Sequence, residues 1–199
     1  MLNSFARWGP FPPLTVALVV ISVLFSIISG FGSSLGMLLP FFISTTANGL
    51  LVEVSAGQVW RLLTPIFIHL SLLHLLFNMM WLWDLGRLIE MRRGLQLFGG
   101  FVLAVGIASN LAQYLITGSP NFGGMSGVVY GLLGFVWMQG RFNPRAGYVM
   151  NKQVVVMMLV WYVLCWTGLL GPIANWAHTG GLLIGVVWGY LDKGGRRAM

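Results

Sequence analysis

Residues 95–117 read LQLFGGFVLAVGIASNLAQYLIT, a run without a charged residue that follows Arg92, Arg93 and Gly94. Crossing about 30 Å of hydrocarbon takes about 20 residues of helix, with ~17 as the lower end. The run is therefore long enough to span a membrane. The two arginines mark one end of it, as basic residues commonly do at the cytoplasmic side.

Five further apolar runs share this character. Together the six predicted spans are residues 13–30, 62–83, 95–117, 126–140, 154–171 and 177–191. A long apolar link, about residues 31–61, is interrupted by glycine and by Pro40, so we expect it to lie in the outer interface of the membrane. Backbone polar groups in lipid must be satisfied internally. The sequence thus predicts an all-α membrane protein, with six transmembrane helices in a single domain over residues 1–199.

The composition agrees with lipid as a large part of the solvent. Of the 199 residues, 57% are hydrophobic and 8% are charged, and the mean hydropathy is +0.85. A soluble domain carries roughly 25% charged residues, so these charges are too few to cover a surface that faces water. The net charge of +7 is spread over the ends of the apolar runs and forms no patch, so we expect no nucleic-acid partner.

The basic residues also predict an orientation. With the N-terminus in the cytoplasm, only Arg61 of the eleven Lys and Arg residues lies outside. The residues placed inside are Arg7, Arg87, Arg92, Arg93, Arg141, Arg145, Lys152, Lys193, Arg196 and Arg197. No small-x-small cleavage site follows the first run, so we expect an uncleaved first helix.

Four polar side chains lie where burial costs several kcal/mol unless they are paired: His74, Asn78, Ser126 and His178. Ser126 and His178 each lie 15 residues before a basic residue, Arg141 and Lys193, or about 22 Å along a helix. His74 lies 13 residues before Arg87, about 20 Å. Three reactive side chains are thus predicted in one layer below the outer surface.

Glycine recurs on one face of the two runs that carry Ser126 and His178. These stripes are Gly127, Gly131 and Gly134 in the fourth run, and Gly181, Gly185 and Gly189 in the last. Small residues at such spacing let helices approach closely in lipid. We therefore expect the two helices to pack and to bring Ser126 within reach of His178, the usual activator of a serine nucleophile.

The four acids limit the chemistry. Glu53 lies in the outer link, and Asp84, Glu90 and Asp192 lie at the cytoplasmic end, so no carboxylate is expected beside His178. This favours a Ser–His dyad and argues against an aspartyl protease, which needs two adjacent aspartates. His69 and His74 are five residues apart with no glutamate between them, unlike the His-Glu-x-x-His pattern of zinc proteases. We expect neither a metal nor a cofactor.

Donors for a developing oxyanion are also present. His74 and Asn78 are four residues apart and share a helix face. Amides around Met125 and Ser126, at a helix start, lack partners within the helix. Each such donor is worth ~2.7–4 kcal/mol in acyl transfer. Gly123 and Gly124 predict an open approach for a substrate backbone, and His69, on another face, is interpreted as structural.

Four segments resemble motifs of the rhomboid family. They are Gly124-Met125-Ser126-Gly127 followed by Tyr130, Ala177-His178-Thr179-Gly180-Gly181, Trp60-Arg61, and His69 to Asn78 with His74 between them. The resemblance covers nearly the whole chain, in the order of the bacterial six-helix type.

The resemblance implies an intramembrane serine endopeptidase that cuts transmembrane protein substrates near the outer boundary of a bacterial inner membrane. Ser126 would be the nucleophile and His178 the general base, then acid. His74, Asn78 and the Ser126 amide would form the oxyanion hole, with Tyr130 stacked on His178 and Gly124 in support. Both termini would be cytoplasmic, the site would open outward, and substrates would enter between the second and fifth spans. We expect no added cytosolic domain or seventh helix.

Two alternatives belong to other classes. A catalytically inactive rhomboid-like protein that binds membrane clients would lack the serine or the histidine, whereas both are present. A small channel or transporter would favour an internal repeat and polar residues along the full depth, whereas here they cluster in the outer half.

Overall fold

The computed structural model describes residues 11–47 and 50–192, and the regular elements among them are helices. The predicted all-α fold is therefore confirmed for these residues. Five residues used in the sequence argument lie outside them: Arg7, Gly49, Lys193, Arg196 and Arg197.

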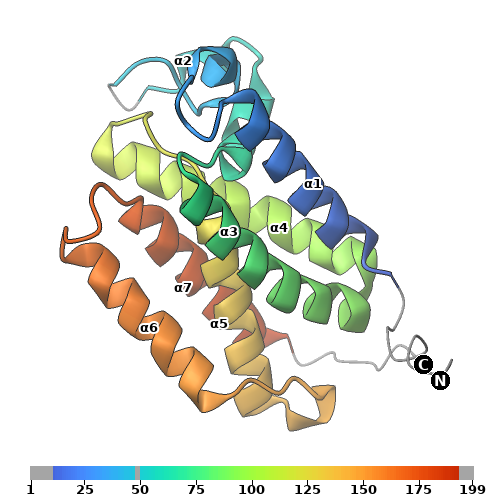
Figure 1. The fold of residues 1–199 in the computed structure, drawn as a ribbon. Helices are drawn as coiled ribbons and strands as arrows, with labels where there is room; N and C mark the ends of the chain where they lie inside the picture. The colour runs from blue at the N-terminus through green and yellow to red at the C-terminus, as the bar shows by residue number, and fades with distance from the viewer. Residues whose placement is uncertain (1–10, 48–49, 193–199) are drawn as a thin grey trace, which may run out of the picture.

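Four helices begin close to their predicted positions (Figure 1). They are α1, Pro13–Ile28; α5, Ser126–Phe142; α6, Lys152–Trp166; and α7, Asn175–Leu191. α6 ends before the predicted residue 171, and Gly168 and Gly171 follow it with φ of 76° and 81°. Positive φ is the conformation that glycine adopts without strain, so these residues turn the chain towards α7.

The second predicted span, residues 62–83, is wrong at its start. The helix begins at Leu72, as α3 (Leu72–Trp81), and continues through a π-helical segment, η5 (Leu82–Gly86), into α4 (Arg87–Thr117). The preceding residues form two 3₁₀ turns, η3 (Val59–Leu62) and η4 (Thr64–Phe67). Pro65 begins the second turn, and Ser71 caps α3 by accepting from the His74 N–H at 3.2 Å. Residues 66–68 are apolar because they are buried in the core, at the end of η4 and directly after it.

α4 is broken at Gly94, where φ is 81° and ψ is 167°. The chain reverses there, so the helix after it begins at residue 95, as predicted. Among the described residues, the helical stretch Leu72–Thr117 that contains this break is long and apolar enough to cross a membrane, and α1 and α6 are shorter apolar helices. Arg87 lies inside the helix that starts at Leu72 and so does not mark its cytoplasmic end. The predicted depth of His74, about 20 Å from Arg87, is therefore not a depth from the end of the helix.

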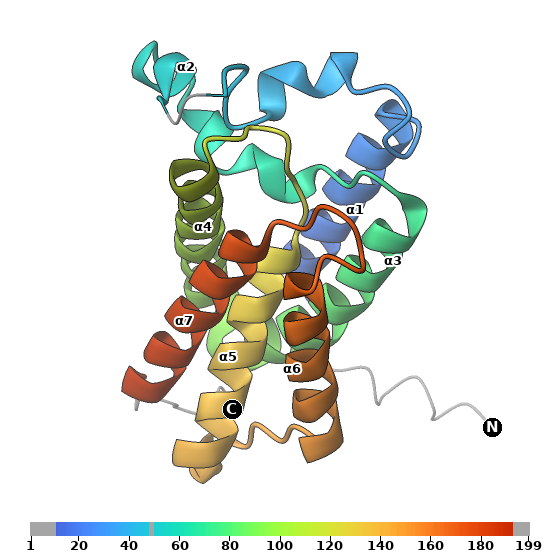
Figure 2. The same cartoon turned by 90° about the vertical axis from the view of Figure 1, so that its left-hand side faces the viewer.

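α7 packs against α5 and α4 (Figure 2). Glycines form its close contact with α5. A Cβ added at Gly181 would lie 1.9 Å from the carbonyl oxygen of Gly127, and one at Gly185 would lie 2.0 Å from that of Gly131. The two backbones therefore touch directly, as the glycine stripes predicted.

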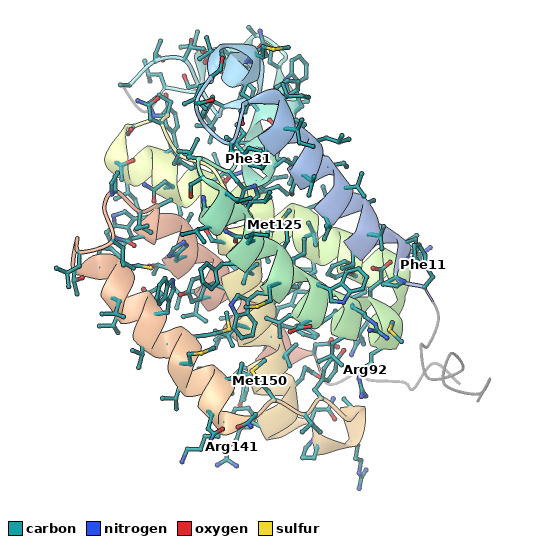
Figure 3. All side chains as sticks on the ribbon, in the orientation of Figure 1. Phe11, Phe31, Arg92, Met125, Arg141 and Met150 are labelled. Carbon is teal, nitrogen blue, oxygen red and sulfur yellow. The ribbon has the colours of Figure 1, made fainter. Side chains whose placement is uncertain are left out.

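Residues 31–47 and 50–62 form a cap over the end of the bundle at which α1 and α4 terminate (Figures 1 and 2). It contains η2 (Gly36–Phe41), α2 (Val52–Ser55) and η3. Arg61, 5% exposed, donates to the carbonyls of Leu39 and Phe42 at 2.9 and 2.7 Å. Trp60 Nε1 donates to the carbonyl of Pro40 at 3.1 Å, so Trp60 and Arg61 both hold the cap together. Arg92 and Arg141 lie towards the opposite end (Figure 3).

The first helix obtains its N-terminal cap from another helix. Glu90 of α4, 5% exposed, accepts from the backbone N–H groups of Leu14 and Thr15, both at 2.8 Å, and from the Thr15 hydroxyl at 2.7 Å. Pro12, at the N-cap position of α1, offers no side-chain hydrogen bond. A carboxylate is favourable there because the free amides of a helix start carry partial positive charge.

Candidate active site

Ser126 and His178 are in hydrogen-bond contact, with 2.8 Å between Ser126 Oγ and His178 Nε2. Ser126 is the first residue of α5, and His178 lies in the first turn of α7. Gly127 follows Ser126 by one residue, and Gly181 follows His178 by three. The direct backbone contact between these glycines brings the two helix starts together. His178 is 5% exposed and Ser126 is half-buried. The arrangement allows the imidazole to accept the serine proton.

The other side of the His178 ring is packed against Tyr130, one turn after Ser126. The ring centroids are 4.8 Å apart and the planes are inclined by 38°. His178 Nδ1 is buried and has no hydrogen-bond partner in the described part of the chain. Three of the four acids are engaged elsewhere: Glu53 with Ser44 and Thr45, Glu90 with α1, and Asp192 with Arg93. The imidazole is thus held by packing against an aromatic ring.

The backbone N–H of Ser126 lies at the start of α5, where amides lack acceptors within the helix. No backbone hydrogen bond from it is found within residues 11–47 and 50–192. The neighbouring Met125 N–H differs from the expectation, because it donates to His69 Nε2 at 3.3 Å. Of the two amides predicted to be free, only that of Ser126 remains available to a ligand.

The His74 ring lies directly against Gly124. A Cβ at Gly124, where φ is +122°, would lie 2.7 Å from His74 Cε1 and Nε2. A Cβ added at Gly123 would lie 2.6 Å from the carbonyl oxygen of Ile68. Both positions are therefore already packed, which differs from the expected open approach. Gly124 instead lets the His74 ring come close to the segment that leads into Ser126.

Asn78 lies one turn after His74 and is 6% exposed. Its side-chain nitrogen donates to the carbonyl of His74 at 2.8 Å. An amide nitrogen carries two hydrogens, so the second N–H of Asn78 is left for another acceptor.

Two functional contacts were missed by sequence reasoning. His69 bonds with both ring nitrogens, to Phe67 O at 3.1 Å and to the Met125 N–H, and its ring packs on His74 with 5.1 Å between centroids. A continuous helix over residues 62–83 would put His69 on a different face from His74. In the structure the helix begins at Leu72, and Pro65 is the local signal for this. Gln113 of α4 accepts from the first amides of α7, and a polar residue within an apolar run could have indicated it.

Comparison with known proteins places the chain in a family. The Rhomboid domain model matches residues 56–194. The chain is 38% identical over 138 residues to Rhomboid protease GlpG of Salmonella paratyphi A (strain ATCC 9150 / SARB42), covering 68% of this chain and 49% of that protein. Rhomboid protease GlpG of Salmonella newport (strain SL254) and of Salmonella choleraesuis (strain SC-B67) show the same identity and coverage. The chain spans about half the length of these relatives. The matched segment contains His74, Ser126 and His178, and the chain therefore belongs to the rhomboid family of helical membrane proteins.

Proposed function

We propose that this protein is an intramembrane serine endopeptidase, which hydrolyses peptide bonds in or near transmembrane segments of membrane proteins. One observation carries the proposal: Ser126 Oγ and His178 Nε2 are 2.8 Å apart inside a helical bundle. A serine alone is a weak nucleophile, and an imidazole at this distance is its usual activator. Proteases named for the same family match 68% of this chain.

In the proposed reaction, Ser126 Oγ attacks the carbonyl carbon of the substrate while His178 Nε2 takes the hydroxyl proton. His178 then gives that proton to the leaving amine, and an acyl-enzyme on Ser126 remains. Water, deprotonated by His178, releases the acyl group and restores the serine. With Nε2 as the acceptor, the ring proton is on Nδ1, and Tyr130 rather than a carboxylate keeps the ring in place.

The developing oxyanion would be stabilised by the Ser126 N–H, His74 and Asn78. The Ser126 amide lies at the N-terminus of α5, where the helix dipole adds partial positive charge. The close contact of His74 with Gly124 keeps its ring next to the segment that carries the nucleophile. The free N–H of Asn78 is the third donor.

We also propose six membrane spans in a bacterial inner membrane, with both termini cytoplasmic and the site opening to the outer side. Arg92 and Arg141 at the end opposite the cap support this orientation. Transmembrane substrates would reach Ser126 between α3 and α6. There the ring centroids of Phe77 and Trp161 are 6.2 Å apart, and both side chains are about half exposed.

A fluorophosphonate probe and a reporter transmembrane substrate test the proposal on the purified protein in detergent. We expect the probe to label the wild type and not Ser126→Ala. We expect His178→Ala to lower kcat by about 10²–10⁴-fold, the usual contribution of general base catalysis. Labelling that persists in Ser126→Ala, or turnover that persists in folded His178→Ala, would contradict it. Binding of the reporter without labelling or cleavage would favour an inactive client-binding protein.

A further inference from the structure

α7 carries His178 in its first turn but supplies no side-chain cap of its own. Ala174 occupies the N-cap position, and no side chain of the helix start bonds to its free amides. Gln113 of α4 does so from outside the helix. Its Oε1 accepts from the N–H of Trp176 at 3.0 Å and from that of Ala177 at 3.3 Å, and the residue is 8% exposed. The Ala177 N–H is shared, because it also donates to the carbonyl of Ala174 at 3.0 Å. Ala177 directly precedes His178.

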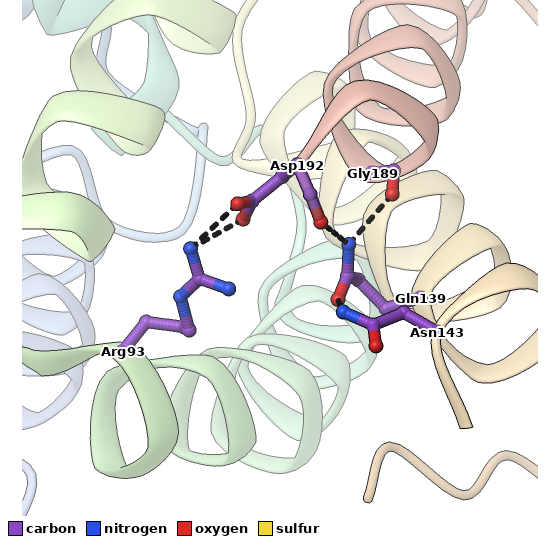
Figure 4. A network of polar contacts seen from close by, with 5 residues as sticks. All are labelled: Arg93, Gln139, Asn143, Gly189 and Asp192. Atoms are coloured by element: carbon purple, nitrogen blue, oxygen red, sulfur yellow. Dashed lines mark hydrogen bonds and ion pairs between the residues drawn. The ribbon is translucent and has the colours of Figure 1, made fainter. Parts of the chain in front are cut away.

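The other end of α7 is held by a second glutamine (Figure 4). Gln139 of α5, fully buried, donates through Nε2 to the carbonyls of Gly189 and Asp192 at 2.7 and 2.6 Å. Asn143 donates to Gln139 Oε1 at 3.1 Å, which orients that amide. Arg93 of α4 also pairs with Asp192, with Nη2 2.7 Å from Oδ1.

The long face between these two ends is made of glycine. At Gly181 and Gly185 the backbone of α7 rests on carbonyl oxygens of α5, with no side chains interlocked. Such a contact fixes how close the two helices lie. It resists sliding along the axis, or rotation of one helix on the other, less than interdigitated side chains would. The first turn of α7 is also held from α6, where Asn175 Nδ2 donates to Cys165 O at 3.0 Å and the hydroxyls of Thr179 and Tyr162 lie 2.7 Å apart. The polar bonds at the ends therefore contribute to the height and rotation of this turn.

We propose that Gln113 is a positioning residue for His178. By bonding two consecutive amides of the first turn, it keeps the imidazole at the height of Ser126. The proposal rests on the protease activity proposed above. A displacement of about 1 Å between reacting groups can lower a rate about 10²-fold, so the loss of this acceptor should act on the chemical step. Substrate binding, which does not involve Gln113, should be little changed.

Gln139 provides a matched control. Each glutamine makes two hydrogen bonds to the backbone at one end of α7. Gln113 bonds at the end that carries His178, and Gln139 bonds at the far end. The variants to compare are Gln113→Leu, Gln139→Leu, Gln113→Asn and Gln113→Glu. The measurements are kcat and KM on the reporter substrate, the labelling rate of Ser126 by the fluorophosphonate, and the thermal unfolding temperature.

We expect both leucine variants to unfold at lower temperature. Only Gln113→Leu should lower kcat and the labelling rate, by about 10–100-fold, with KM within about twofold. Gln113→Glu retains an acceptor oxygen and should recover most of the rate. Gln113→Asn keeps the polarity but falls one methylene short, and should give an intermediate loss even if Gln113→Leu does not fold.

Two results would overturn the proposal. One is a wild-type kcat in Gln113→Leu, or in Gln113→Asn where the leucine variant does not fold. The other is an equal loss of kcat in Gln139→Leu, which would assign the effect to the general stability of α7. Failure of the proposed function is distinct, because then the wild type itself would show neither turnover nor labelling of Ser126.

Discussion

Gly181 of α7 rests on the carbonyl group of Gly127 in α5 so closely that a Cβ would lie 1.9 Å from the oxygen and 2.8 Å from the carbon. Gly127 follows Ser126 directly, and Gly181 lies one turn after His178. The contact between the two glycines therefore determines the distance between the two side chains.

Gly181→Ala should separate α5 from α7 at this point. Since backbone atoms of Gly127 cannot move as a flexible side chain would, we expect a loss of about 1–3 kcal/mol or more in stability, as for overpacking of a core. The widened gap should also abolish labelling of Ser126. Thermal unfolding in detergent and fluorophosphonate labelling measure the two effects. Gly100→Ala is the control, because nothing lies within 4 Å of a Cβ there. Wild-type labelling in Gly181→Ala would show that the contact does not set the site.

Tyr130 should act through its ring and not through its hydroxyl group. The ring packs on His178 at 4.8 Å, whereas the hydroxyl only donates to Met158 O at 3.3 Å. Tyr130→Phe should keep kcat within about threefold, and Tyr130→Ala should lower it by about tenfold, since an aromatic pair is worth about 0.5–1.5 kcal/mol. Steady-state cleavage of the reporter substrate measures both. Equal losses in the two variants would assign the role to the hydroxyl.

His69 should stabilise the segment that leads into Ser126. His69→Phe removes the acceptor of the Met125 N–H, and a buried donor left without a partner costs about 1–3 kcal/mol. His69→Gln offers an amide oxygen to the same N–H and should recover part of that stability. The free energy of unfolding of the three proteins tests this. No difference between His69→Phe and His69→Gln would mean that packing, and not the hydrogen bond, is what His69 contributes.

Glu53 should make the cap sensitive to acid. Burial alone would raise its pKa, but hydrogen bonds from the hydroxyl and backbone N–H of Thr45 and from the hydroxyl of Ser44 outweigh this and hold the pKa at about 2, below the usual 4.5. A lowered pKa in the folded state stabilises the fold above pH 4.5, and that stabilisation is lost as the pH falls towards 2. Glu53 is only half-buried, so water screens these interactions and we expect a change of less than about 1 kcal/mol.

The pH dependence can be measured as the rate of proteolysis within the cap. The wild type should become more susceptible between pH 4.5 and pH 2, with an acid-stable protease as the reagent. Glu53→Gln, which cannot titrate, should show a flat profile over this range. The same profile in both proteins would contradict a role of the carboxylate.

Sequence reasoning predicted the helical class, most helix positions and the glycine contact, because apolar runs and small-residue spacing leave a local pattern. It misplaced the start of the second helix because burial makes residues 66–68 apolar whether or not they are helical. Pro65 and Ser71, a turn former and a helix cap, hold the information that hydropathy lacks.

The candidate site shows a similar division. Ser126, His178 and Tyr130 could be chosen from the sequence because their residue types and spacing indicate a chemistry. The bond of His69 to Met125 could not, because it depends on the three-dimensional approach of irregular chain. The bond of Gln113 to α7 could not, because it joins two helices and no residue spacing in the sequence points to it. Polarity within an apolar run was their only local sign.

The capping of α1 by Glu90 also has a consequence for biogenesis. Because proteins are made from the N-terminus, the amides of Leu14 and Thr15 lack this acceptor until about 75 further residues have been synthesised. The N-terminal cap of α1 can thus form only after the chain through Glu90 has been made. Ser126 and His178 lie further along the chain, so the ribosome makes both partners of this cap before it makes the serine and the histidine.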